Sequence, residues 1–281
     1  MGIWNDRTNS LQMKTLELVK VDHHIKLGDI CEEITPNIIE DTIFYSDGEA
    51  VGFYLKQIPN KLQNLVNVAN AELLSDRVPK TKMNRGPTLS KAAQKQIIND
   101  GGEVIQPIQQ YSTIIGSCAA KPHMRMPYPR TSMVHDVKSA ETFIKAMLLA
   151  CKESEDLINE ITPNIFAKQK AIIEEKVPLK FRFGRLFTSS ISNFNIAANY
   201  HRDAGNLEGC VNVIIAKKSH ARGGNTTIPD YNATVDSRDN SILVYPAWRN
   251  VHGVTPIIPL KNGGYRNSLV FYPLKAFNNY W

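Results

Sequence analysis

The stretch NYHRDAGN (residues 199–206) carries a His and an Asp two positions apart, and a second His follows at position 252. Two imidazoles and one carboxylate form the ligand set that holds Fe(II) by one face and leaves the opposite face open. Residues i and i+2 of a β-strand face the same side, so we expect His201 and Asp203 to reach one metal ion. His252 would come from a later strand. An H-x-D tripeptide alone occurs in many proteins without a metal, so the interpretation depends on the ordered set.

The segment RNSLVFY (residues 266–272) follows the second His and reads as a strand. The period of two places Arg266, Ser268, Val270 and Tyr272 on one face. A guanidinium that points into a β-barrel needs an anionic partner, because an unpaired buried charge is costly. That partner is either a structural Asp or Glu of the protein or the distal carboxylate of 2-oxoglutarate, with a hydrogen bond from the Ser268 hydroxyl. The iron ligands upstream favour 2-oxoglutarate.

The composition is that of a globular protein of 281 residues with 42% hydrophobic and 21% charged residues. No stretch is apolar enough to span a bilayer, and the first residues lack the apolar core of a secretory signal. The four Cys form no C-x-x-C pair, which argues against a disulfide framework or a Cys-rich zinc module and favours a reducing, cytoplasmic setting. The net charge of +6 is compatible with a polyanionic partner but is weak support for one. Nothing indicates an obligate protein partner.

The chain changes character along its length. Residues 1–110 are mixed, with a strand expected at 51–58 and a helix at 91–99 capped by Ser90. Helices are expected from Val137 to Cys151, capped by Asp136, and between Pro163 and Pro178. Further strands are expected at 111–118, 180–188, 191–200, 209–216, 225–229, 240–246, 251–257 and 266–273. Many short strands at regular spacing predict a sandwich, jelly roll or barrel.

Three basic loops are candidate phosphate contacts, because Lys and Arg around the mouth of a site neutralise phosphates. A solvated surface is the commoner explanation for such loops. The third loop is favoured because it follows the metal-binding segment. The loops contain Lys80, Lys82 and Arg85; Lys121, Arg125 and Arg130 with Tyr128, in the Pro-rich segment 121–132; and Lys217, Lys218, His220 and Arg222.

Residues 198–273 resemble the TET/JBP family, the Fe(II)- and 2-oxoglutarate-dependent dioxygenases that oxidise the 5-methyl group of pyrimidines in nucleic acids. His201-Arg202-Asp203-Ala204-Gly205-Asn206 is similar to the family's HRDxxN segment, and Arg266–Tyr272 to its RxSLVFY strand. Gly223-Gly224 with Pro229-Asp230-Tyr231 resembles the GGxxxxPxY segment of microbial and fungal members. His252-Gly253 with Pro256 resembles the distal ligand motif. The resemblance covers about the last third of the chain and fits a compact microbial or phage enzyme.

The resemblance implies a mainly β fold with α: a double-stranded β-helix (jelly-roll or cupin-like) over residues 111–281, with N-terminal helices packed against it. Residues 1–110 would form an extension that contributes to substrate binding. Asn206 falls where the family places an Asn that binds the target base, and Tyr272 where an aromatic ring stacks on it; a turn residue and a core aromatic are the alternatives. Leu274 stands where animal members have a His, so base reading would differ in part.

The expected activity is hydroxylation of the 5-methyl group of 5-methylcytosine in DNA to 5-hydroxymethylcytosine or a further oxidised base. Fe(II) would be held by His201, Asp203 and His252, and the co-substrates would be 2-oxoglutarate, bound by Arg266 and Ser268, and O2. The alternatives are thymine in DNA, giving 5-hydroxymethyluracil, and hydroxylation of a protein or small molecule. A nucleic-acid-binding module without catalysis is disfavoured because every iron and carboxylate position is filled.

Overall fold

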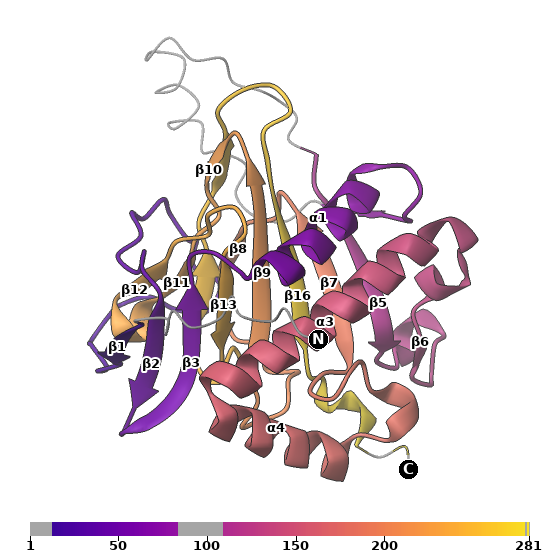
Figure 1. Cartoon of the computed structure of the whole chain (residues 1–281), viewed down its shortest axis with the longest axis horizontal. Helices are drawn as coiled ribbons and strands as arrows, with labels where there is room; N and C mark the ends of the chain where they lie inside the picture. Colours follow the sequence, from indigo (N-terminus) through magenta and orange to yellow (C-terminus); the bar gives the residue numbers. More distant parts are fainter. Residues whose placement is uncertain (1–12, 84–108, 279, 281) are drawn as a thin grey trace, which may run out of the picture.

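The computed structural model describes residues 13–83, 109–278 and 280, and its strands form a large and a small sheet (Figure 1). Among these residues the large sheet has ten strands, in the order β1 (Lys14–Glu17), β2 (Thr42–Ser46), β3 (Glu49–Leu55), β13 (Ile242–Tyr245), β9 (Asn212–Ser219), β16 (Tyr265–Tyr272), β7 (Ser189–Phe194), β5 (Tyr111–Cys118) and β4 (Thr81–Lys82), with β6 (Arg130–Thr131) paired to β5. The small sheet has the order β12 (Ala233–Val235), β11 (Thr226–Ile228), β14 (His252–Val254) and β8 (Ala198–His201). A further pair joins β10 (Ala221–Gly223) to β15 (Ile257–Pro259).

Helices cover one face of the large sheet, where α1 and α3 cross in front of β9, β16 and β7 (Figure 1). The helices are α1 (Asn60–Leu74), α3 (Glu141–Ile161) and α4 (Pro163–Lys176), and short 3-10 turns lie at Pro122–Met124, Met133–Asp136, Lys138–Ala140, Leu179–Phe181, Pro229–Tyr231 and Lys275–Phe277. The main core lies between helices and sheet: Phe143 and Met147 of α3 pack in the same fully buried cluster as Leu269 and Phe271 of β16. Truncating one of these aromatic rings to Ala would cost about 3–5 kcal/mol. The other face of β16 is thereby left for the site.

The arrangement is the double-stranded β-helix expected from the sequence, with helices packed against it. Strand 111–118 and the helix that begins at Pro163 are confirmed. Pro163 fits the first turn because its missing N–H has no intrahelical partner there. The strand expected at 191–200 divides into β7 and β8, and the one at 251–257 into β14 and β15.

Two expectations about local structure were wrong, and one helix was not predicted. Residues 180–188 form a 3-10 turn and an isolated bridge between Phe183 and Phe187 instead of a strand. Asp136 does not cap α3, which begins at Glu141; Ser132 caps the preceding 3-10 turn by accepting a hydrogen bond from the Val134 N–H. Helix α1 was not foreseen, because its apolar spacing lies among many polar residues.

The N-terminal residues share the large sheet with the rest of the chain. β3 pairs antiparallel with β13, with Phe53 opposite Val244. The large sheet therefore contains strands from both sides of residue 110. The proposed boundary between an N-terminal extension and the oxygenase domain stays a prediction. The expected helix 91–99 and the basic residue Arg85 lie outside the described residues. Within the described part of the chain, no helix is long and apolar enough to cross a membrane.

Candidate metal and 2-oxoglutarate site

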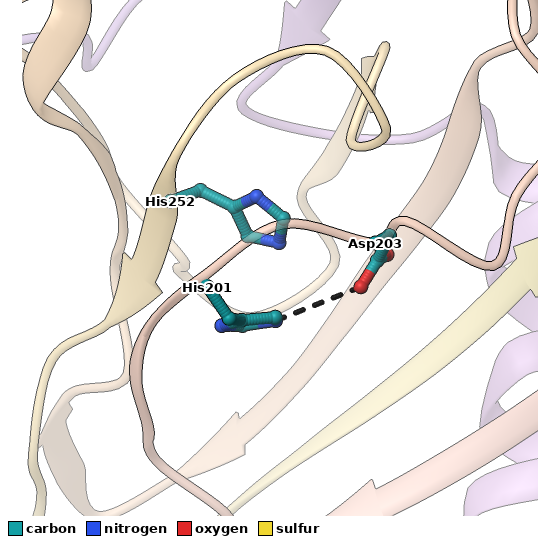
Figure 2. A group of neighbouring side chains, drawn as sticks. All are labelled: His201, Asp203 and His252. Atoms are coloured by element: carbon teal, nitrogen blue, oxygen red, sulfur yellow. Dashed lines mark ion pairs between the residues drawn. The ribbon is translucent and has the colours of Figure 1, made fainter. Parts of the chain in front are cut away.

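The proposed metal ligands converge at the junction of β8 and β14. These strands pair antiparallel with His201 directly opposite His252, and the two ring centroids lie 4.3 Å apart. Asp203 Oδ1 lies 3.6 Å from His201 Nε2, and Figure 2 shows the three side chains pointing toward one another. One ligand atom from each residue lies within 4.8 Å of the others, which is close enough to share one ion.

Asp203 reaches the site by a turn and not by strand alternation. β8 ends at His201, so the expectation that His201 and Asp203 lie on one face of a strand was wrong, although both side chains reach the site. The backbone N–H of Asp203 donates to the carbonyl of Ala247, and its own carbonyl accepts from the N–H of Asn206. These two bonds fix the turn that returns the carboxylate toward the imidazoles.

Both imidazoles are oriented for metal binding through Nε2. Nδ1 of His201 lies 2.7 Å from the carbonyl oxygen of Asn199, and Nδ1 of His252 lies 3.0 Å from that of Asn250. A carbonyl can only accept, so a neutral ring donates from Nδ1 and keeps the Nε2 lone pair free for a metal. Burial, followed by the charge of His201, lowers the pKa of His252 and favours the neutral ring. The donor set therefore fits a ferrous ion.

The ligands open into a cavity of about 520 Å³ between the two sheets. β16 contributes alternate residues, because Arg266, Ser268, Val270 and Tyr272 all line it, as the period of two predicts. A cavity of this size suits a small organic molecule together with part of a larger substrate. The remaining lining comes from both sheets and from the turn after β8: Ile191, Asn193, Ile196, Ala198, His201, Arg202, Asp203, Ala204, Gly205, Asn206, Asn212, Ile214, Thr226, Tyr245, His252, Val254 and Leu274.

Arg266 is a buried cation without an acid partner. Its Nε and Nη2 donate to the Ser237 hydroxyl at 3.2 and 3.1 Å, and no Asp or Glu among the described residues lies within ion-pair distance of it. Burial lowers the pKa of Arg266 to about 10. The alternative of a structural carboxylate is thus excluded for the described part of the chain. The guanidinium is available to a carboxylate that enters the cavity.

Two Gly positions of the motifs permit close packing here. A Cβ on Gly224 would lie 3.1 Å from Cδ of Arg266, and one on Gly253 would lie 2.9 Å from Cβ of Cys31. Gly224 also has a φ of 69°, which L side chains rarely adopt. The first Gly therefore lets the backbone lie against the Arg266 stem, and the second brings the N-terminal segment against β14.

The two proposed base-binding residues line the cavity. Asn206 is buried; its Nδ2 donates to Asn212 Oδ1 at 2.9 Å and, at 3.4 Å, to Asp203 Oδ2. It is also the turn residue that the alternative interpretation expected. Tyr272 is partly buried, and burial raises the pKa of its hydroxyl. Sequence reasoning missed Asn212 and Ser237, because neither belongs to a motif and only the fold brings them to the site.

The basic residues divide into two groups. Lys217 is buried, and its Nζ binds Asp239 and Asn240; Nζ of Lys218 donates to the carbonyl of Gly223 at 2.7 Å. Both ammonium groups are held by protein oxygens, which argues against the predicted phosphate contacts at these positions. Both residues belong to β9 rather than to a loop. Burial lowers the pKa of Lys218 to about 8.

The other candidate phosphate contacts stay predictions. Arg125 is exposed, while His220 hydrogen-bonds through Nδ1 with the Ser219 hydroxyl. Arg222 is half exposed and lies 3.2 Å from a carboxylate oxygen of Glu33. Among the described residues, Nη1 of Arg130 is buried without a hydrogen-bond partner.

Fold and site together define an Fe(II)- and 2-oxoglutarate-dependent oxygenase. Residues 119–275, more than half of the chain, match the Tet_JBP family, described as the oxygenase domain of the 2OGFeDO superfamily. The chain therefore belongs to the TET/JBP family of these oxygenases. No curated protein matches its sequence significantly.

Several solved structures are similar to this chain, and one of them, NgTET1, shares its fold. The structure of NgTET1 in complex with 5mC DNA aligns with a TM-score of 0.57 at 14% identity, covering 92% of this chain and 85% of NgTET1. An oxidoreductase of the 2OG-Fe(II) oxygenase family from Burkholderia pseudomallei aligns with a TM-score of 0.43 at 13% identity, covering 81% and 86% of the two chains. A full-length Neurospora crassa protein, solved in complex with alpha-KG, aligns with a TM-score of 0.38 at 15% identity, covering 79% and 75%.

Proposed function

We propose that this oxygenase hydroxylates the 5-methyl group of 5-methylcytosine in DNA to 5-hydroxymethylcytosine. The observation that carries the choice of base is the direction of the hydrogen bonds around Asp203. The carboxylate can only accept, so Asn212 must turn its Nδ2 to Asp203 and its Oδ1 to Asn206. Asn206 must then use its Nδ2 for Asn212. Its Oδ1, which accepts no hydrogen bond from any residue that the structure describes, is left for a ligand in the cavity.

An acceptor at this place distinguishes the two pyrimidines. On a pyrimidine ring the 4-substituent is next to the 5-methyl group. Asn206 hydrogen-bonds to the proposed metal ligand Asp203, so its side chain is well placed to meet the 4-substituent when the methyl group faces the metal. The 4-substituent of 5-methylcytosine is an amino donor, whereas that of thymine is a carbonyl acceptor. Two facing acceptors repel, and Asn206 Oδ1 therefore favours cytosine. NgTET1, whose fold this chain shares, was solved with 5mC DNA.

The protein's part in the reaction is positioning. His201, Asp203 and His252 would hold Fe(II), and Arg266 with Ser268 would bind the distal carboxylate of 2-oxoglutarate. Together with O2 these groups supply the oxidation of a methyl to a hydroxymethyl group, with succinate and carbon dioxide as co-products. The base must leave the duplex to enter the cavity, where Tyr272 offers a stacking surface. Arg125, Arg130, His220 and Arg222 are the remaining candidates for phosphate, and the N-terminal extension for further DNA contacts.

The test is mass spectrometry of DNA that contains both 5-methylcytosine and thymine, digested after incubation with enzyme, Fe(II) and 2-oxoglutarate. Both candidate substrates are then present in one tube, and the ratio of 5-hydroxymethylcytosine to 5-hydroxymethyluracil measures the preference directly. We expect 5-hydroxymethylcytosine to predominate. A predominance of 5-hydroxymethyluracil would transfer the proposal to thymine, and succinate formation without either product would show that 2-oxoglutarate decarboxylation is uncoupled from DNA oxidation and would overturn DNA as the substrate.

A further inference from the structure

The two oxygens of the Asp203 carboxylate have different surroundings. Oδ1 faces the imidazoles, 3.6 Å from His201 Nε2. Oδ2 accepts hydrogen bonds from Asn212 Nδ2 at 2.9 Å and from Asn206 Nδ2 at 3.4 Å. One oxygen is thus free for a metal, while the other is held by two amides.

Asn212 is fixed by its own surroundings. It is buried and begins β9, where it pairs with Tyr245 of β13 in the middle of the large sheet. Its Oδ1 accepts the 2.9 Å hydrogen bond from Asn206, so the amide cannot turn over without placing two acceptors together. A central strand is among the most rigid parts of a fold, and a donor on it holds its acceptor in place.

We propose that Asn212, supported by Asn206, is a positioning residue that keeps Asp203 a one-oxygen metal ligand. Turning the carboxylate so that both oxygens face the metal would break the charge-assisted bonds to Oδ2. A two-oxygen carboxylate would also take up a further position on the metal. 2-Oxoglutarate and O2 would need the positions that the three protein ligands leave open, so a carboxylate that occupied one of them would compete with the co-substrates. The inference depends on the 2-oxoglutarate chemistry and not on the choice of base.

The test is the affinity of the full chain for Mn(II), measured by isothermal titration without O2, with and without 2-oxoglutarate. Asn212→Leu keeps the size of the side chain and removes both its donor and its acceptor. We expect Mn(II) to bind about 10- to 100-fold more weakly, as is typical when the partner of a metal ligand is lost. We also expect the affinity of the Mn(II)-loaded variant for 2-oxoglutarate to fall, because the freed carboxylate competes for the metal.

Asn70→Leu is the matched control. Asn70 is also buried and lies on α1, where its Nδ2 donates to the Tyr265 hydroxyl at 2.9 Å. Its Oδ1 accepts a hydrogen bond from Asn267, whose position on β16 alternates with those of the cavity-lining residues. This variant should lose stability while its Mn(II) affinity stays within about twofold of the wild type. If Asn212 had a purely structural role, Asn212→Leu would likewise lose stability and keep its Mn(II) affinity.

A folded Asn212→Leu variant with Mn(II) and 2-oxoglutarate affinities within twofold of the wild type would overturn the proposal. Should that variant fail to fold, Asn206→Leu is measured in the same way. It removes the donor that orients Asn212, and unchanged Mn(II) affinity there would overturn the proposal equally. The metal titrations contain no DNA, so their outcome does not depend on which base is oxidised. The wild-type DNA digest decides the substrate without any of these variants, and the two proposals therefore fail separately.

Discussion

Replacing Arg266 by Leu should make the empty protein more stable and the co-substrate bind more weakly. The pKa of the buried guanidinium is about 10 instead of above 12, and each pH unit corresponds to about 1.4 kcal/mol, so burying the charge costs about 3 kcal/mol at neutral pH. Leu removes that cost and leaves the Ser237 hydroxyl without its donors, a loss of about 1 kcal/mol. The net gain is about 2 kcal/mol, or about 5 °C in Tm.

The same substitution should abolish most of the affinity for 2-oxoglutarate. Truncating one partner of a buried charge pair costs about 2–4 kcal/mol, which corresponds to a rise of about 30- to 1,000-fold in Kd. The assay is thermal unfolding of the Mn(II)-loaded protein, without O2, over a series of 2-oxoglutarate concentrations. The wild-type Tm should rise with 2-oxoglutarate, and the Arg266→Leu Tm should begin higher and stay flat at the same concentrations.

Arg238→Leu is the control for removing an arginine. Arg238 lies one residue beyond Ser237, is 43% exposed and pairs with Asp236, so its loss should change stability by less than about 1 kcal/mol and leave the response to 2-oxoglutarate unchanged. The reasoning is refuted if empty Arg266→Leu is less stable than the wild type and its Tm still rises at wild-type 2-oxoglutarate concentrations.

Four further outcomes are expected. His201→Ala should abolish succinate formation, and a rate equal to the wild type would remove the iron assignment. Asn206→Leu should lower the ratio of 5-hydroxymethylcytosine to 5-hydroxymethyluracil about tenfold, the equivalent of one hydrogen bond; an unchanged ratio in the DNA digest would contradict its role in base reading. Lys218→Ala should leave the salt dependence of DNA binding unchanged, whereas Arg125→Ala should reduce the slope of log K against log salt by about 0.9 if that side chain touches phosphate; fluorescence anisotropy at several salt concentrations distinguishes the two. Because burial lowers the pKa of His252, the unfolded state takes up its proton first as the pH falls. The contribution of His252 to the stability of the metal-free protein should therefore fall by at most about 1.4 kcal/mol per pH unit between about pH 6.5 and about pH 4, and denaturant titrations of a His252→Gln variant should show a smaller loss than the wild type over that range.

Local patterns in the chain were enough for the chemistry of the site. The types and order of His201, Asp203 and His252 specify a metal, because few other arrangements use two imidazoles and a carboxylate in this way. The period of two placed Arg266, Ser268 and Tyr272 on one face, and the structure has all three on the cavity wall. Alternation is a property of the extended backbone itself, so it is visible before any partner strand is known.

The tertiary structure alone decided what surrounds each of these groups. Asp203 arrives by a turn tied to Ala247, and Asn212 comes from a different strand to hold its second oxygen. Lys217 and Lys218 resemble a basic loop in the sequence, yet β9 extends through them and their charges bind protein oxygens. A hydrogen-bond partner that lies on another element of the fold leaves no periodic trace in the sequence. For this protein the sequence therefore indicated which side chains form the candidate metal-ligand set, and the packing of two sheets determined how those side chains are held and which of the described basic side chains are left without protein partners.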